Sequence, residues 1–138
     1  MVVKLTAEEA IPFINEYNHW SGTTVADPDM AKFCTWVGVA VNDVVRAVLG
    51  LQAIDDGKVF VWGMFGDGSG TIDECVAGVH LMHIVNSLPY ELQGAILPSN
   101  VAQQRRAGRN GWIKTDTQVM CGTDGELQEL WERPYKAG

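Results

Sequence analysis

Residues 58–88 read KVFVWGMFGDGSGTIDECVAGVHLMHIVNSL, and this stretch decides the fold that the sequence predicts. An apolar strand over residues 58–65 leads into a glycine-rich turn at residues 66–70 and then into a helix over residues 71–88. This order places the backbone N–H groups of the turn at a helix N-terminus, where the helix dipole also favours an anion. The stretch is therefore a candidate cofactor-binding site.

Length and composition predict one globular domain over residues 1–138. The chain has 138 residues, of which 46% are hydrophobic and 20% are charged, and this size and balance suit a single core. It contains no repeat, low-complexity tract or apolar run of membrane-spanning length, and its first residues lack a signal-peptide core. We therefore expect a soluble, cytoplasmic protein with no membrane partner.

The charge is acidic overall but basic in one place. The formal net charge is −7, which argues against a protein that coats nucleic acid through its phosphates. Four of the ten basic residues, however, lie close together in the sequence, namely Arg105, Arg106, Arg109 and Lys114. Such a local patch is suited to a small anionic ligand.

The cysteines and histidines predict neither a disulfide framework nor a metal site. Cys34, Cys75 and Cys121 are odd in number, far apart and set among apolar neighbours, which favours buried thiols. His80 and His83 lie three residues apart on the predicted helix. No cysteine or carboxylate accompanies them in a ligand pattern, so we predict core or surface histidines there.

Hydrophobic periodicity predicts elements in the order α, β, β, β, α, β, α, β, β. Turns at Asn42-Asp43 and at residues 55–57 divide the first three strands into an antiparallel meander. The strand, helix, strand order that follows predicts one parallel pair, and hence a mixed α/β (α+β) fold. The expected elements are a helix at 7–17, a short helix at 29–33, strands at 35–41, 44–54 and 58–65, a helix at 71–88, a strand at 92–97, a helix from 99 or 100 to 107, and strands at 112–121 and 127–133.

Capping boxes predict where the two longer helices begin. Thr6 with Glu9 starts the first, and Thr71 with Glu74 starts the helix over residues 71–88. One face of this second helix carries apolar residues at helical spacing, and we expect that face to pack on the sheet. It consists of Ile72, Cys75, Val76, Val79, Met82 and His83.

Two motifs occur at defined places in this order of elements. The turn reads Phe65-Gly66-Asp67-Gly68-Ser69-Gly70, and Asn100 precedes Gly111-Trp112. Together they resemble the GNAT N-acetyltransferase superfamily, which has a pyrophosphate loop of pattern Gln/Arg-x-x-Gly-x-Gly/Ala and, later, an Asn followed by Gly-Phe. The resemblance covers about residues 35–121. It identifies the chain as a divergent member and implies a GNAT-like mixed sheet with helices on both faces.

The resemblance implies acetyl-CoA, or another acyl-CoA, as the donor substrate, bound where the fourth and fifth strands splay apart. Backbone groups of Val61 and Gly63 would hold the pantetheine arm, and the turn would hold the pyrophosphate. Arg105, Arg106 or Arg109 would pair with the nucleotide phosphates. The implied donor-binding residues are Val61, Gly63, Phe65, Gly66, Asp67, Gly68, Ser69, Gly70, Thr71, Asn100, Arg105 and Arg106.

Three positions depart from the family pattern. Phe65 replaces the first Gln or Arg of the loop, and Asp67 puts a carboxylate in the turn, where it weakens the binding of a diphosphate. Ala107 stands where the family has a general-acid Tyr.

Because residues 58–65 also contain no acid, the proton transfers of an acyl transfer need other groups. The candidate catalytic residues are Asn100, Ser99 and His19, and Glu91 and His83 are further candidates for a water relay.

Three functions stay open from the sequence. The first is an N-acyltransferase acting on an amine of a small molecule or protein, and the second is a GNAT-fold binding module without catalysis. The third is a nucleobase-modifying protein, because His19-Trp20-Ser21-Gly22 resembles a segment of the phage Mom-type DNA-modification proteins, although the acidic net charge argues against a nucleic-acid partner. A homodimer is also compatible with the tryptophans near predicted edges, which are Trp20, Trp36, Trp62, Trp112 and Trp131.

Overall fold

The computed structural model describes residues 1–21, 32–67, 69–121 and 126–134. Within these ranges, no helix is both long and apolar enough to cross a membrane. The helices are α1 (Ala7–Ser21), α3 (Ile72–Ser87) and α4 (Val101–Arg109), and the strands are β1 (Val2–Leu5), β2 (Thr35–Val41), β3 (Val44–Asp55), β4 (Lys58–Met64), β5 (Glu91–Ile96), β6 (Ile113–Cys121) and β7 (Glu126–Arg133).

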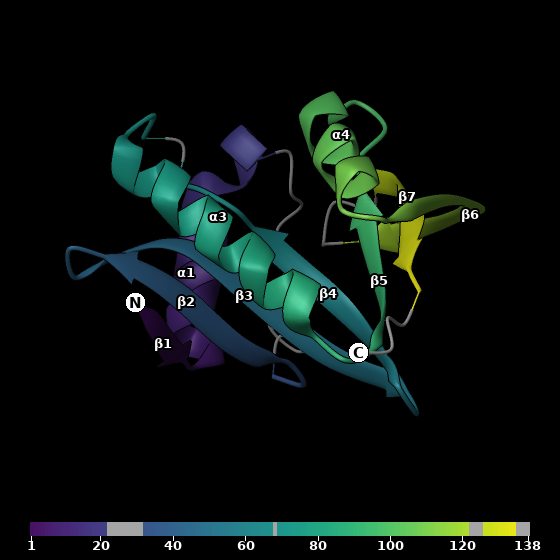
Figure 1. Ribbon diagram of the computed structural model, residues 1–138, viewed down its shortest axis with the longest axis horizontal. Coiled ribbons are helices and arrows are strands. Elements are labelled where there is room, and N and C mark those ends of the chain that lie inside the picture. The colour runs from purple at the N-terminus through teal and green to yellow at the C-terminus, as the bar shows by residue number, and fades with distance from the viewer. Residues whose placement is uncertain (22–31, 68, 122–125, 135–138) are drawn as a thin grey trace.

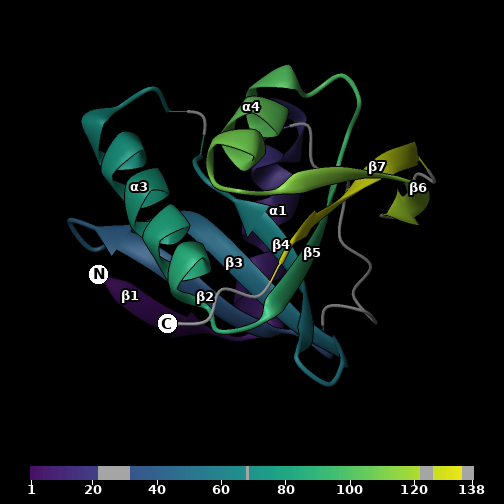
Figure 2. The same cartoon turned by 45° about the vertical axis from the view of Figure 1, so that its right-hand side comes forward.

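The strands form one seven-stranded sheet in the order β1-β2-β3-β4-β5-β7-β6. The pair β4–β5 is parallel, and the other neighbouring strands are antiparallel. Helices α3 and α4 lie on one face of the sheet and α1 lies on the other (Figures 1 and 2). The predicted fold class is confirmed: an antiparallel meander precedes a parallel crossover pair, with helices on both faces.

The turns of the meander fall where the sequence predicts them. Asn42 and Asp43 join β2 to β3 with φ values of 52° and 64°, the left-handed pair that a two-residue hairpin of matching twist requires. The predicted helix at residues 29–33 and the turn at residues 122–125 lie mainly outside the described residues.

The first strand is absent from the predicted order, which began with a helix. Val2–Leu5 pairs antiparallel with β2, with Leu5 opposite Trp36. The exposure of its residues alternates, but over four residues only. Such a short segment does not let hydrophobic periodicity distinguish a strand from the chain that leads into a helix. The helix that follows, α1, begins at its predicted residue and runs to Ser21 instead of ending near Tyr17.

Each face of the sheet has its own apolar cluster. Below α1, Ala10 and Ile14 pack with Trp36 and Val48. The larger cluster lies between α3 and the sheet and contains Val39, Val41, Ala47, Leu49, Val59, Val61, Ala77, Leu81, Val85 and Leu92.

Helix α3 begins as predicted but presents a different face to the sheet. Thr71 is the N-cap, and its Oγ1 accepts a hydrogen bond from the Glu74 amide at 3.2 Å. The buried residues are Ala77, Leu81 and Val85. The predicted packing face, Ile72, Cys75, Val76, Val79, Met82 and His83, is wrong, because all of it except half-buried Met82 is exposed.

Small residues decide which face of α3 packs inward. Apolar residues lie on all sides of this helix, so hydrophobic periodicity is compatible with more than one face packing on the sheet. A Cβ at Gly78 would lie only 2.7 Å from the Phe65 carbonyl oxygen, so the close approach of α3 to the sheet needs the face that bears Ala77 and Gly78. Because Cys75 lies on the outer face, the prediction of a buried thiol is wrong for that residue.

Val79→Lys is expected to change the free energy of unfolding by no more than about 0.5 kcal/mol, because the Val79 side chain is 57% exposed. Thr71→Ala is the control and should cost about 1 kcal/mol through loss of the cap. Urea denaturation measures both. If Val79→Lys lowered the free energy of unfolding by more than about 2 kcal/mol, the face that periodicity predicts would be the one that packs on the sheet.

The C-terminal strand is tied to α3 by a buried arginine. Arg133 of β7 is 1% exposed. Its guanidinium donates from Nη1 to the Val85 carbonyl at 2.7 Å, and from Nη2 to the carbonyls of Leu88 at 2.7 Å and Tyr90 at 2.9 Å. These carbonyls lie at the end of α3 and in the connection to β5, where a cation also suits the negative end of the helix dipole.

Candidate functional site

The site lies where the two parallel strands separate. β4 and β5 are paired only from Lys58–Glu91 to Phe60–Gln93, and beyond that point their carboxyl ends diverge (Figure 1). β4 remains paired with β3, and β5 remains paired with β7. The opening therefore exposes inner edges of two strands that are themselves held rigidly from outside.

A cavity of about 60 Å³ lies in this opening, between α3 and α4. Val61, Gly63, Phe65 and Arg106 were predicted from the sequence, and they line it together. The other lining residues were not assigned to the donor site from the sequence, and they are Met82, Val85, Gly94, Ala95, Ile96, Gln103, Ala107, Trp112 and Trp131.

Among these residues, Trp112 stands in the second sequence motif, and Gly94 carried a further usable signal. A glycine inside a strand often marks the close approach of another group, and the ring of Trp112 lies 3.4 Å from where a Gly94 Cβ would be. Trp131 comes from β7, and its buried indole N–H has no acceptor among the described residues. No local pattern places that ring in the cavity.

Arg106 is the one member of the predicted basic patch that lines the cavity. Its guanidinium carbon lies 5.0 Å from the centroid of the Phe65 ring, within the range of a cation–π contact. Burial, with a smaller contribution from the charge of Arg109, lowers the pKa of the Arg106 guanidinium. Its hydrogen bond among the described residues is to Gln103 Oε1 at 3.4 Å, so no carboxylate balances this half-buried cation there.

The rest of the basic patch faces elsewhere. Arg105 and Arg109 are exposed on α4, and Lys114 forms an ion pair with Glu129 of β7.

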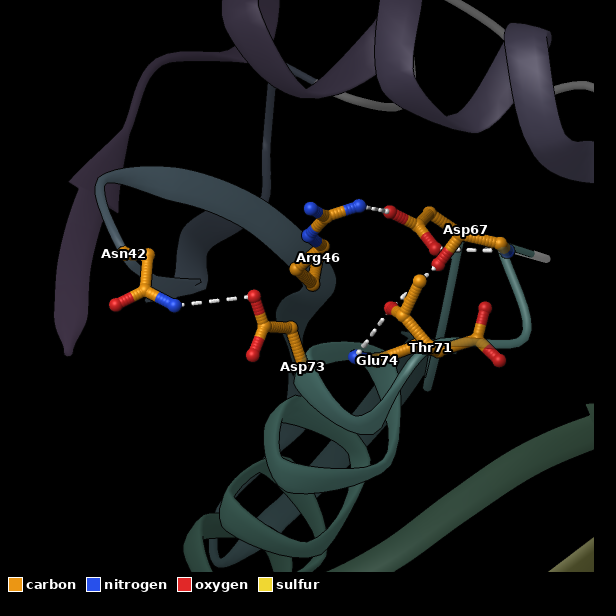
Figure 3. A network of polar contacts seen from close by, with 7 residues as sticks. Asn42, Arg46, Asp67, Thr71, Asp73 and Glu74 are labelled. Atoms are coloured by element: carbon orange, nitrogen blue, oxygen red, sulfur yellow. Dashed lines mark hydrogen bonds and ion pairs between the residues drawn. The ribbon is translucent and has the colours of Figure 1, made fainter.

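The turn after β4 neutralises the carboxylate that the sequence placed in it. Asp67 is 7% exposed, and its Oδ2 pairs with Arg46 Nη1 of β3 at 2.8 Å (Figure 3). Its Oδ1 accepts from the Ser69 amide at 3.0 Å. Burial acts to raise the pKa of Asp67, but hydrogen bonds from Arg46 and Ser69, with a smaller contribution from the neighbouring Glu74 carboxyl, outweigh it and lower the pKa to about 2. The negative charge of Asp67 is thus satisfied inside the protein.

The start of α3 leaves room for an anion. Gly70 has a φ of 69°, and a Cβ there would meet nothing within 4 Å. The amides of Ile72 and Asp73 belong to the first helical turn and have no intrahelical acceptor, whereas that of Glu74 is capped by Thr71. Gly68 lies outside the described residues, so its predicted role stays a prediction.

The predicted catalytic residues fall into two groups. Asn100 caps α4, because its Oδ1 accepts from the Gln103 amide at 3.2 Å, and exposed Ser99 precedes it. His19 belongs to α1, on the opposite face of the sheet, and its side chain is not among those described.

The other relay and metal candidates lie away from the cavity. Glu91 lies at the paired end of β4 and β5, and His80 and His83 are exposed on the outer face of α3. In the described part of the chain, no three potential metal ligands come together.

Comparison with known proteins finds similar structures but no match by sequence. No protein-family model matches the chain, and no curated protein matches it. The ribosomal-protein-S18-alanine N-acetyltransferase from Escherichia coli superposes with a TM-score of 0.69 at 13% identity, covering 100% of this chain and 95% of that one. This chain has the GNAT fold.

Two further structures with the GNAT fold are ligand complexes. The PaiA N-acetyltransferase from Thermoplasma acidophilum, in complex with coenzyme A, gives a TM-score of 0.65 at 13% identity over 98% of both chains. A GNAT-family acetyltransferase from Elizabethkingia anophelis with acetyl-CoA bound gives 0.67 at 14% identity over 96% of both chains. The fold expected from the resemblance is confirmed.

Both sequence motifs occupy the expected places in the GNAT fold. The turn at residues 65–70 joins β4 to α3, and Asn100 and Gly111-Trp112 flank α4. They lie on the same face of the sheet as the cavity, to which Phe65 and Trp112 contribute.

Proposed function

We propose that the protein is an acyl-CoA-dependent N-acyltransferase that takes acetyl-CoA in the opening between β4 and β5 and acetylates an amine of a small molecule or protein. The observation that carries the proposal is the pairing of Asp67 with Arg46. It removes the charge that opposed a diphosphate, next to a helix N-terminus with free first-turn amides. The half-buried Arg106 adds a cation that no carboxylate of the described chain balances.

The residues fit the donor unevenly along its length. Backbone amides of residues 70–73 suit the phosphates, whereas the Ser69 amide already donates to Asp67. The arginines of α4 suit the nucleotide end of the donor. The unpaired inner edge of β4 at Val61 and Gly63 suits the pantetheine arm, but the ring of Phe65 fills the space above Gly63 beside that edge. The phosphate end of the site therefore fits better than the arm.

Bound acetyl-CoA would supply a thioester whose carbonyl carbon a neutral amine attacks, forming a C–N bond and releasing a thiolate while the amine loses a proton. In this chain, Ala107 is buried against Ile96 and Trp131 and offers no proton. Ser99 and Asn100, together at the start of α4, are candidates to hold a water that relays the proton, and His19 stays the third candidate.

Gly70→Glu is expected to weaken CoA binding at least tenfold in isothermal titration calorimetry, because it adds bulk and negative charge to the proposed phosphate site. Gly57→Glu is the matched control: Gly57 also has a positive φ, of 71°, and open space around it, but it lies at the other end of β4. The two variants share backbone strain and charge, so only the site differs. Equal CoA affinities in both would show that the turn does not hold the phosphates.

A binding module without catalysis is the second candidate, and the buried Ala107 favours it. Thiol release from acetyl-CoA over a panel of amines separates the two functions. CoA binding without thiol release for any amine would favour the module, whereas release that Gly70→Glu abolishes would favour the enzyme.

A further inference from the structure

The side chain of Phe65 folds back over the strand that precedes it. A Cβ built at Gly63 would lie 2.8 Å from Phe65 Cε2 and 3.2 Å from Cζ, so the ring rests on the bare backbone of Gly63. This is the stretch of β4 that has lost its pairing with β5. The ring therefore fills the space above Gly63, where it lines the cavity in the opening.

The ring is held from several sides. The Arg106 guanidinium of α4 lies 5.0 Å from its centroid, and the apolar cluster beneath α3 packs against it. On the other side of the opening, the Trp112 ring lies against Gly94. About 60 Å³ remains between these groups, whereas sites for ligands of drug size measure roughly 300–1,000 Å³.

We propose that Phe65 and Arg106 form a gate, closed in this structure, that must open before an acyl-CoA arm enters between β4 and β5. The proposal rests on the proposed function, since it concerns access to the same site. One side-chain rotation moves the ring off Gly63, and it frees Arg106 from its aromatic contact next to the expected phosphates. The loop pattern that this turn resembles has Gln or Arg at this position, where this chain has an aromatic ring.

A closed gate lowers the apparent affinity of the ligand by the fraction of molecules in which it is open. Phe65→Ala removes the ring and the contact with Arg106, so the site is open in every molecule. A ligand that enters the slot should therefore bind about tenfold more tightly to Phe65→Ala. A ligand that stays outside the slot should bind equally well to both proteins.

The test is calorimetric titration with two probes: CoA, and adenosine 3′-phosphate 5′-diphosphate, its nucleotide half without the arm. The variants are Phe65→Ala and Phe65→Leu, and the matched control is Phe60→Ala. Phe60 lies on the same strand but packs beside Trp62, with ring centroids 5.3 Å apart. Circular dichroism and urea denaturation check folding, and Phe65→Leu, which keeps apolar volume, replaces Phe65→Ala should the latter not fold.

A gate predicts that CoA affinity rises about tenfold in Phe65→Ala, with nucleotide affinity and both Phe60→Ala affinities within twofold of wild type. CoA binding that is detected only in the Phe65 variants also supports it. The gate is overturned if the affinities for CoA and for the nucleotide change equally, or if Phe65→Ala binds CoA no more tightly than wild type does. In either case the proposed function stands as long as the nucleotide binds. Failure of both probes to bind any variant overturns the gate and the proposed function together.

Discussion

Arg133→Met is expected to destabilise the protein by about 3–5 kcal/mol. The variant keeps most of the apolar stem but removes the guanidinium that donates to the carbonyls of Val85, Leu88 and Tyr90. Hydrogen bonds to charged groups contribute about 1.5–3 kcal/mol each, and buried carbonyls left without a donor add to the loss. The gain from no longer burying a charge offsets part of it. Val85 is the least affected acceptor, since its carbonyl also receives the Leu88 amide.

Chemical denaturation in urea measures this effect, and two variants sharpen it. Arg105→Met removes an exposed arginine of α4 and should change stability by no more than about 0.5 kcal/mol. Arg133→Lys keeps the charge but not the fork of donors, so it should fall between wild type and Arg133→Met. If Arg133→Met lost less than about 1 kcal/mol, the tie between β7 and α3 would not stabilise the fold.

Where local chemistry decides the structure, the sequence predicted it. Asn42-Asp43 needed only its own backbone preferences to set the β2–β3 turn. Thr71 and Asn100 are caps whose acceptors and donors lie within three residues of each other. The parallel crossover followed from the order of elements, because parallel strands need a long connection. The fold class rested on these features.

Where packing decides, the sequence did not suffice. Helix α3 is apolar on both sides, and its inward face depends on how closely Gly78 approaches Phe65, two residues on different elements. The short β1 owes its existence to the free edge of β2 rather than to its own pattern. Neither feature can be predicted from a short stretch of sequence.

In the site, too, local motifs predicted some features and tertiary contacts decide the others. The motifs placed Val61, Gly63 and Phe65 at the opening, but no spacing rule predicts that Arg46, 21 residues before Asp67, reaches its carboxylate. Nor does the motif say that the Phe65 ring lies on Gly63, because its direction depends on Arg106 of α4. The electrostatics of the turn and the closure of the cavity both come from tertiary contacts.

Asp67→Asn is expected to destabilise the protein by about 2–3 kcal/mol at pH 7. The carboxylate is buried, it pairs with Arg46 at 2.8 Å, and its pKa is lowered from 3.8 to about 2. That difference corresponds to about 2 kcal/mol, and leaving a partly buried arginine without its carboxylate adds to the loss. Asp116→Asn, which removes an exposed carboxylate of β6, should change stability by no more than about 0.5 kcal/mol.

The pH dependence separates the ion pair from simple packing. Because the pKa of Asp67 is lower in the folded state, its contribution is complete above about pH 4 and is lost as the pH falls toward 2. Urea denaturation at pH 7, 5, 4 and 3 should therefore show wild type and Asp67→Asn converging only below pH 4. Urea is suitable because it leaves the charges unscreened, whereas guanidinium chloride would mask them. A stability difference that stayed constant from pH 7 to pH 3 would mean that the Asp67 charge does not stabilise the turn, and Asp67 would then act through shape and hydrogen bonding alone.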